Sequence, residues 1–313
     1  MKTQAVLFEE PKHVDVRQLT LVEPEDGDIV VKSLWSGIST GTEKRLFEGS
    51  MPFFPGLAYP LVPGYETVGR VVDTRPGSDL SENQLVLIPG SRCFKEAAGL
   101  FGASASTLVT KAEKAVPLDE RIAQEGTLLS LAATAYHALT LPQTPVPNVI
   151  VGHGVLGRLA ARLLIALGHP EPVVWETNPV RRTGAGAYEV TTPEASAGKV
   201  FDAILDASGD PAVIDLAVRH LKPGGTIILA GFYDDRMSFE FAPAFMREAR
   251  IVIAAEFRPA DLIAVSELVT DGSLSLTGLI THSAPARDAR AAYQTAFNDP
   301  SCVKMILEWE AAQ

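Results

Sequence analysis

Short apolar runs separated by polar, glycine- and proline-containing turns fill the first third of the chain. These runs lie at residues 5–8, 29–32, 68–72 and 84–88, and they have the length and composition of β-strands. Their regular spacing favours a partly open β-barrel over a parallel sheet. A longer helical pattern over residues 122–141 follows the last of them.

From residue 149 onward, strand-like and helix-like patterns alternate, which is typical of βαβ units in a doubly wound parallel sheet. Expected strands lie at 149–151, 173–175, 202–206, 226–230 and 250–255, and expected helices lie at about 156–167, 211–221 and 259–271. The tail returns to mixed structure, with a run at 279–282, a helix near 286–298 and a last strand at 303–307. We therefore expect an α/β protein in which residues 1–131 and 257–313 form one domain and residues 132–256 a Rossmann domain.

The segment after the strand at 149–151 has the spacing G-x-G-x-x-G and opens a helix. The first glycine of this pattern permits a tight turn, the second lets the backbone approach a pyrophosphate, and the third lets helix and strand pack closely. The free N–H groups at the helix N-terminus favour an anion. The residues expected to hold a dinucleotide here are Gly152, His153, Gly154, Val155, Leu156 and Gly157.

The next strand ends in Glu176, where an acidic side chain binds the ribose hydroxyls of the adenosine. A carboxylate at this position repels a 2′-phosphate, so the sequence favours NAD over NADP. Arg181 lies nearby and is a further candidate contact, although it also fits a solvated surface. Two later strands end at the same expected crevice, which adds Ala207, Ser208, Gly231 and Phe232 to the candidate cofactor residues.

Composition excludes several classes of function. The chain has 313 residues, a net charge of -11 and 46% hydrophobic residues, and no basic stripe suggests nucleic-acid binding. No stretch is apolar enough for a transmembrane segment or a signal peptide. The two cysteines, Cys93 and Cys302, lie far apart in sequence, which suits a cytoplasmic enzyme without disulfides.

Taken in order, these elements resemble the medium-chain dehydrogenase/reductase family. The segment at 64–71 matches the family pattern G-H-E-x-x-G-x-V, Gly37-Ile38-Ser39 matches G-[IV]-C, and residues 134–136 match the helix that leads into the cofactor domain. The resemblance implies a GroES-like catalytic domain joined to the Rossmann domain. It also implies that Thr134 lies near the cofactor.

The zinc-binding pattern of that family is altered in this sequence. Where zinc-containing members have a cysteine, a histidine and a third ligand, this chain has Ser39, Tyr65 and, by alignment, Ser130. Hydroxyl groups are poor zinc ligands beside thiolates and imidazoles. The lobe with four cysteines is missing as well. We therefore expect no metal of either the catalytic or the structural kind.

Within the family, the segments at 36–43 and 54–66 resemble members that act in bacteriochlorophyll synthesis. This resemblance implies a tetrapyrrole substrate whose 3-(1-hydroxyethyl) group is oxidised to acetyl by hydride transfer to NAD. One alternative is a zinc-independent quinone or enone reductase that uses NAD(P)H, and Glu176 argues against it. A second is a non-catalytic NAD-binding protein.

Without zinc, hydroxyl or imidazole groups must stabilise the alkoxide and carry its proton. Tyr65 stands at the position of a metal-binding histidine, and it either contacts the substrate oxygen or simply fills the vacated site. Glu66 is a candidate base or an orienting carboxylate. Ser39 and Thr42 are candidate donors as well as plausible turn residues. His137 is of a residue type suited to proton transfer, but a lone histidine on a helix is more often structural.

Apolar residues crowd one loop and suit a large flat ring, although the loop can equally pack on its own prolines. The candidate substrate-pocket residues are Phe47, Met51, Phe53, Phe54 and Tyr59. The strand at 250–255 resembles the one that pairs sheets across a two-fold axis in the family. By analogy, a homodimer is expected.

Overall fold

The computed structural model describes residues 1–233 and 236–309. The chain divides into two compact units, Met1–Ser130 with Thr277–Gln313, and Leu131–Leu276. The first division lies within a residue of the boundary expected from the sequence. The second differs, because residues 257–276 group with the Rossmann unit rather than with the first.

The first unit contains two mostly antiparallel sheets. One has the strand order β2-β1-β4-β7, and the other has the order β16-β17-β3-β5-β6-β9, with β8 also paired to β3. The strands are β1 (Lys2–Glu10), β2 (His13–Thr20), β3 (Asp28–Ile38), β4 (Leu61–Val62), β5 (Thr67–Thr74), β6 (Leu85–Ile88), β7 (Ala98–Gly99), β8 (Thr107–Lys111), β9 (Val116–Pro117), β16 (His282–Pro285) and β17 (Met305–Glu308).

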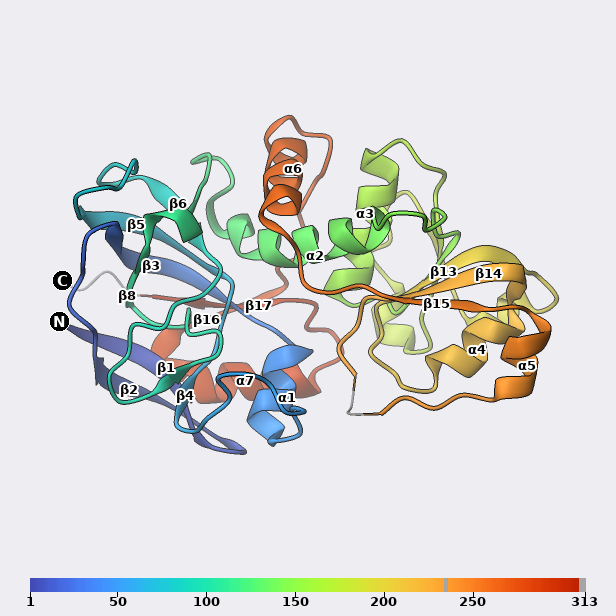
Figure 1. Cartoon of the computed structure of the whole chain (residues 1–313), viewed down its shortest axis with the longest axis horizontal. Coiled ribbons are helices and arrows are strands. Elements are labelled where there is room, and N and C mark those ends of the chain that lie inside the picture. The colour runs from blue at the N-terminus through green and yellow to red at the C-terminus, as the bar shows by residue number, and fades with distance from the viewer. Residues whose placement is uncertain (234–235, 310–313) are drawn as a thin grey trace. The chain divides into compact units, whose positions relative to one another are not determined.

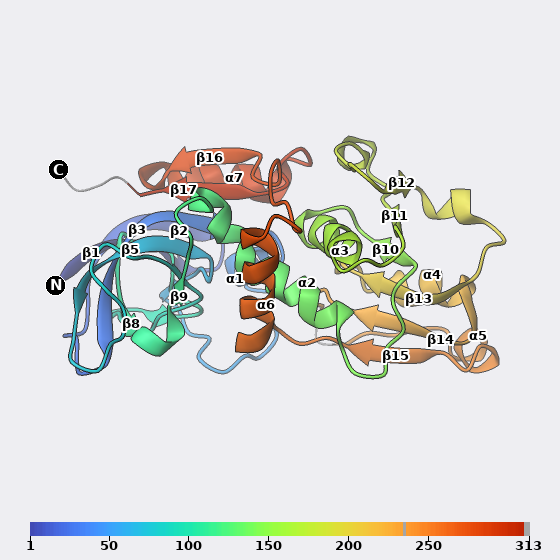
Figure 2. The same cartoon turned by 90° about the horizontal axis from the view of Figure 1, so that it is seen from above.

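Two helices complete the first unit, α1 (Thr42–Glu48) and α7 (Ala289–Asn298). The helix α7 lies beside β16 and β17 (Figure 2). β17, close to the C-terminus, pairs antiparallel with β3 and so joins the last part of the chain to a central strand of the N-terminal sheet. Buried side chains such as Phe8, Leu61 and Tyr293 fill one of the two apolar clusters described in this unit.

The second unit is built on one parallel sheet with the order β12-β11-β10-β13-β14-β15. Its strands are β10 (Val149–Val151), β11 (Val173–Trp175), β12 (Glu189–Thr191), β13 (Phe201–Asp206), β14 (Leu221–Leu229) and β15 (Arg250–Ile253). Helix α3 (Val155–Ala166) lies on one side of the sheet and α4 (Val213–Arg219) on the other (Figure 1). The expected doubly wound sheet is therefore present.

The remaining helices of the second unit are α2 (Leu129–Leu139, whose first two residues belong to the first unit), α5 (Phe241–Met246) and α6 (Pro259–Thr270). Short 3₁₀ helices lie at Ala112–Lys114, Ala123–Leu128, Pro179–Arg182, Pro193–Ser196 and Ala286–Asp288. The helical pattern expected over 122–141 is thus divided into a 3₁₀ segment and an α-helix. No helix in the described part of the chain is long and apolar enough to cross a bilayer.

The strand β14 is longer than the expected strand at 226–230, because it begins at Leu221 and includes residues 222–225. Its register against β13 shifts between Phe201 and Ala203. Gly224 has a φ of +76°, which accommodates the irregularity within the strand.

Candidate active site and cofactor site

The glycine-rich turn of the second unit joins β10 to α3. Gly152 has a φ of +94°, and a Cβ on this residue would lie 3.0 Å from the backbone of Ser208. A Cβ on Gly157 would overlap the carbonyl oxygen of Gly152, whereas one on Gly154 would have no neighbour within 4 Å. The turn therefore leaves open space at Gly154 and packs tightly at the other two glycines, as dinucleotide binding requires.

Glu176 is nearly buried directly beside this turn. One carboxylate oxygen accepts the N–H of His153 at 3.0 Å, and the other accepts the N–H of Asn178 at 2.7 Å. These two bonds fix the carboxylate at the carboxyl end of β11, where it is placed to meet a ribose. Together with the free N–H groups at the start of α3, a 12-residue helix, these residues fit a dinucleotide.

The other candidate cofactor residues have varied surroundings. Ala207 and Ser208 follow β13 beside Gly152, and Gly231 lies against Gly209. Phe232 is exposed, Leu156 lies in the first turn of α3, and Thr134 is half-buried on α2. Arg181 lies in the 3₁₀ helix Pro179–Arg182 after β11.

His153 has a side chain that is fully buried rather than turned toward a ligand. Its Nδ1 lies 2.6 Å from the carbonyl oxygen of Arg181, and its Nε2 lies 2.9 Å from the hydroxyl of Tyr188. Both ring nitrogens are therefore used within the protein. The role of His153 as a residue of the dinucleotide-binding loop stays a prediction.

Asp206 is an organising residue that the sequence did not single out. Its carboxylate is buried at the end of β13 and accepts bonds from the backbone N–H and hydroxyl of Ser208, from Gly209 and from the Tyr233 hydroxyl. Burial raises the pKa of Asp206 against the opposing effect of these donors. The carboxylate therefore shapes the loop that borders the glycine-rich turn. A buried strand ending in an aspartate was the only sequence signal for it.

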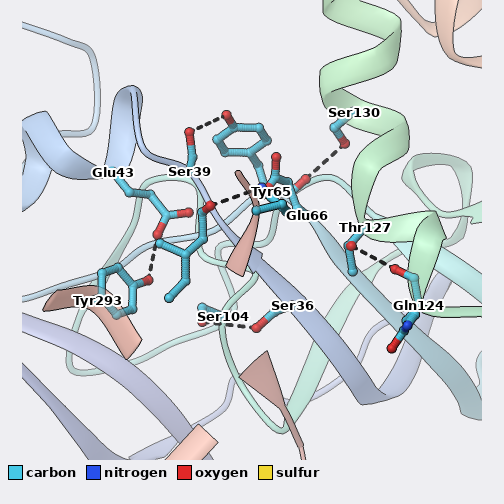
Figure 3. A network of polar contacts seen from close by, with 12 residues as sticks. Ser36, Ser39, Glu43, Tyr65, Glu66, Ser104, Gln124, Thr127, Ser130 and Tyr293 are labelled. Atoms are coloured by element: carbon cyan, nitrogen blue, oxygen red, sulfur yellow. Dashed lines mark hydrogen bonds and ion pairs between the residues drawn. The ribbon is translucent and has the colours of Figure 1, made fainter. Parts of the chain in front are cut away.

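In the first unit, the residues at the zinc-ligand positions contact one another (Figure 3). The Tyr65 hydroxyl donates to Ser39 Oγ at 2.9 Å, and the Ser130 hydroxyl donates to the carbonyl oxygen of Tyr65 at 3.1 Å. Burial, with the nearby Glu66 carboxyl, raises the pKa of Tyr65 well above its usual value, and the hydroxyls of Ser39 and Thr42 oppose this rise. Tyr65 is therefore a hydrogen-bonding phenol rather than a phenolate.

Glu66 forms a buried ion pair with Lys304, which also donates to the Ile38 carbonyl at 3.1 Å. Burial raises the pKa of Glu66, and the ammonium group of Lys304 opposes that rise. The pairing with a basic neighbour makes Glu66 an orienting group rather than a free base. Lys304 comes from just before β17, far away in the sequence, so no local pattern pointed to it.

Glu43 is a second buried carboxyl beneath the cluster. It accepts the hydroxyl of Tyr293 at 2.6 Å, and its other oxygen has no hydrogen-bond partner among the described residues. Burial, opposed by the Tyr293 hydroxyl, raises the pKa of Glu43 to about 8. This carboxyl therefore carries a proton at neutral pH, a property that its position at the start of α1 did not reveal.

These side chains do not fit a zinc ion. The hydroxyls of Ser39, Tyr65 and Ser130 already bond within the protein, and the two buried carboxyls bond to Lys304 and Tyr293. Within residues 1–233 and 236–309, no cluster of three histidine, cysteine or acidic side chains has the geometry of a metal site. Both cysteines are buried as free thiols.

His137 lies in the second unit, where its side chain links two helices. Its Nδ1 lies 2.9 Å from Asp261, whose carboxylate also caps the start of α6 through the N–H of Arg258 at 2.7 Å. The pair joins α2 to α6. These contacts within the second unit fit a structural role for His137, and a catalytic role stays a prediction.

The candidate pocket residues mostly belong to the apolar core of the first unit. Met51 is buried in this cluster, and Phe47, Phe54 and Tyr59 pack against it. Phe53 alone is 94% exposed. An unforeseen contact is the edge-on packing of Phe101 against Tyr65, with ring centres 5.3 Å apart. Phe54 packs edge-on against the same Phe101. The rings of Phe54, Phe101 and Tyr65 therefore contact one another in a row, which ends at the hydroxyl cluster.

Known proteins match this fold and its motifs. A family model described as zinc-binding dehydrogenase matches residues 156–271. The 2-desacetyl-2-hydroxyethyl bacteriochlorophyllide A dehydrogenase of Rhodobacter capsulatus is 52% identical, and the alignment covers 100% of both chains. The chain belongs to the medium-chain dehydrogenase/reductase family.

A second relative supports this membership, and a solved structure shows the same fold. The enzyme of the same name from Cereibacter sphaeroides is 51% identical over 99% of each chain. Among solved structures, an Escherichia coli alcohol dehydrogenase complexed with NADH has a TM-score of 0.85 at 19% identity and covers 98% of this chain and 99% of its own. This medium-chain dehydrogenase therefore shares its fold with enzymes from which its sequence has diverged widely.

Proposed function

We propose that this chain oxidises the 3-(1-hydroxyethyl) group of a bacteriochlorophyllide to acetyl, with NAD as hydride acceptor and without zinc. Full-length identity of 51–52% to two enzymes named for this substrate carries the proposal. The glycine turn and Glu176 support the cofactor, because a fixed carboxylate at the ribose disfavours a 2′-phosphate.

The glycine-rich turn and Glu176 would hold NAD, which would supply the acceptor for the hydride of the carbinol carbon. The hydroxyl proton must then leave. The neutral Tyr65–Ser39 pair cannot keep an extra proton, so its role is that of a relay: Tyr65 accepts the alcohol proton while passing its own to Ser39, and Ser39 passes its own proton on to solvent. Because the Tyr65 proton is donated to Ser39, the phenol oxygen can accept a hydrogen bond from the substrate alcohol. Conjugation of the product ketone with the macrocycle eases the oxidation, which makes the lack of a Lewis acid chemically tolerable.

The substrate's flat apolar ring suits the aromatic side chains near Tyr65. Phe101 packs against Tyr65, and Phe54 packs against Phe101. We assign the exposed Phe53 to the same surface, where it would contact the macrocycle.

The decisive experiment is an assay of the purified protein with hydroxyethyl-bacteriochlorophyllide and either NAD or NADP. We expect NADH formation together with the red-shifted absorption of an acetyl pigment, a preference for NAD, and no loss of rate with a zinc chelator. The proposal fails if the pigment is unchanged. Loss of activity with a chelator and its recovery with added zinc would refute the metal-free mechanism.

We also propose a homodimer formed through β15. This strand is the last in the order of the described parallel sheet, and its Ile253 is 77% exposed. The preceding helix α5 exposes Phe245 and Met246, at 65% and 75%. An apolar strand edge of this kind suits pairing with a second copy. Light scattering should give a molar mass in solution of twice the chain mass. For Ile253→Lys, the molar mass should fall to that of a single chain.

A further inference from the structure

Arg158 on α3 is a buried arginine without a carboxylate partner among the described ion pairs; its side chain bonds to backbone carbonyls instead. Its Nε donates to His153 at 3.0 Å, its Nη1 to Gly184 at 3.1 Å, and its Nη2 to Arg181 at 3.1 Å and to Thr183 at 2.8 Å. Only 6% of the residue is exposed. Burying a cation costs free energy, and the four charge-assisted hydrogen bonds offset this cost. They therefore hold the backbone around Arg158 in one conformation.

His153 holds the same segment from the other side. The carbonyl oxygen of Arg181 can only accept, so His153 Nδ1 must carry the proton and Nε2 must accept from the Tyr188 hydroxyl. Desolvation lowers the pKa of His153 to about 4, against the opposing effect of its bond to Arg181, and keeps the ring neutral at physiological pH.

The segment that both residues hold, Arg181–Gly184, follows the strand that ends in Glu176. Gly184 has a φ of +77°, and a Cβ there would lie 2.7 Å from the Arg158 guanidinium. The backbone N–H of His153 in turn donates to Glu176. Arg158, His153, Glu176 and the segment therefore form one connected network beside the glycine-rich turn.

We propose that Arg158 and His153 are positioning residues that fix Glu176 and the segment Arg181–Gly184 in the arrangement that selects NAD over NADP. The inference rests on the proposed assignment of this turn to a nicotinamide dinucleotide. A carboxylate excludes a 2′-phosphate only while it is held in place. Once the segment is released, the carboxylate can turn away and the guanidinium groups of Arg181 and Arg182 can turn toward the phosphate.

The inference is tested by measuring the dissociation constants of NAD and NADP and comparing their ratio between variants. Calorimetry on the full-length protein, without pigment substrate, gives both constants. Arg158→Met removes all four bonds, and Arg158→Lys keeps the charge but loses the planar fork. Arg219→Met is the control for loss of an arginine side chain, because Arg219 lies at the exposed end of α4 (Val213–Arg219) in the same unit. Thermal unfolding and circular dichroism check that each variant is folded.

We expect Arg158→Met to lower the preference for NAD over NADP at least about tenfold, as loss of donors to buried carbonyls beside a ligand should do. Arg158→Lys should lie between this variant and the wild type, and the control Arg219→Met should stay within about twofold of the wild type. In turnover assays, KM for NAD should rise while kcat at saturating NAD stays nearly constant. A structural role alone would lower stability without changing the ratio of the two affinities.

An unchanged ratio in folded Arg158→Met would overturn the inference. If Arg158→Met fails to fold, Arg158→Lys and Tyr188→Phe provide the test instead. Tyr188→Phe removes only the hydroxyl that bonds to His153. An unchanged ratio of the two affinities in both variants would equally refute the inference. A wild-type protein that binds neither nucleotide, or prefers NADP, would refute the inference together with the cofactor assignment. NAD binding without pigment oxidation would refute the proposed substrate alone.

Discussion

The hydroxyl of Tyr65 donates a hydrogen bond to Ser39 Oγ at 2.9 Å, so two residues at zinc-ligand positions of the family bond to each other. A zinc ion would need both oxygens as ligands, and here one proton lies between them. The pair is therefore the part of the first unit best placed to orient an alcohol and relay its proton in the absence of a metal.

Tyr65→Phe should reduce kcat at least about tenfold, because it removes the hydroxyl and keeps the ring against Phe101. Ser39→Ala should have a similar effect, and the double variant should be little worse than either one, since the two hydroxyls act as a unit. The check is steady-state kinetics with saturating NAD. Full turnover by Tyr65→Phe would reduce Tyr65 to a packing residue.

Glu43 makes stability depend on pH in a defined direction. Its folded-state pKa of about 8 lies above the ordinary 4.5, so the folded state holds an extra proton between these values. The contribution of this protonated carboxyl to the free energy of unfolding is complete below about pH 4.5 and is lost as the pH rises through 8. Glu43→Gln keeps an acceptor for Tyr293 and should remove this loss, stabilising the protein at pH 8 by on the order of 2 to 4 kcal/mol.

Denaturant unfolding at pH 6 and pH 8.5 would measure the effect of Glu43→Gln. The control is Glu48→Gln, on the exposed end of the same helix, which should leave the pH dependence as it is in the wild type. If the two variants have the same pH dependence, Glu43 is ionised in the folded protein and the predicted direction is wrong.

Lys304→Met should destabilise the first unit by about 3–5 kcal/mol, because it leaves the Glu66 carboxyl buried without its counter-ion. The double variant Lys304→Met, Glu66→Gln should recover much of that loss. A double-mutant cycle from urea unfolding measures the coupling. Additive effects of the two substitutions would show that the pair contributes no interaction of its own.

The glycines of the turn offer a matched pair of substitutions. Gly157→Ala should destabilise the second unit by about 1–3 kcal/mol, because its methyl group overlaps the carbonyl of Gly152. Gly154→Ala meets no atom and should fold normally, yet weaken NAD binding at least about tenfold by blocking the approach of the pyrophosphate. Normal NAD affinity in Gly154→Ala would argue that the nucleotide lies elsewhere.

The sequence predicted the parts of the protein that are encoded locally. The run from Val149 to Gly157 specifies a strand, a tight turn and a helix within a few residues, and β10 and α3 form there. The glycine spacing alone indicated where a pyrophosphate would fit. The β-rich first unit was foreseen for the same reason, since its strands carry the alternation and turn residues of β structure.

Contacts between distant residues were not predictable in this way. Lys304 reaches Glu66 only because β17 pairs with β3. The four carbonyls that Arg158 binds come from the glycine-rich turn and from the end of the 3₁₀ helix Pro179–Arg182 with the two residues after it, about 30 positions further along the chain. Apolar residues gave an ambiguous signal as well. Phe47 and Met51 look alike whether they line a pocket or fill a core, and in the structure they join the core.

The pairing of β17 with β3 has a consequence for synthesis on the ribosome. Residues 131–276 contain every strand of their own sheet, so the nucleotide-binding half can complete its fold as it emerges. The preceding 130 residues must wait for the final strand, and until it arrives the nascent chain keeps Glu66 without its ammonium partner. A message cut short before codon 304 would thus yield a finished Rossmann unit attached to an unfinished barrel.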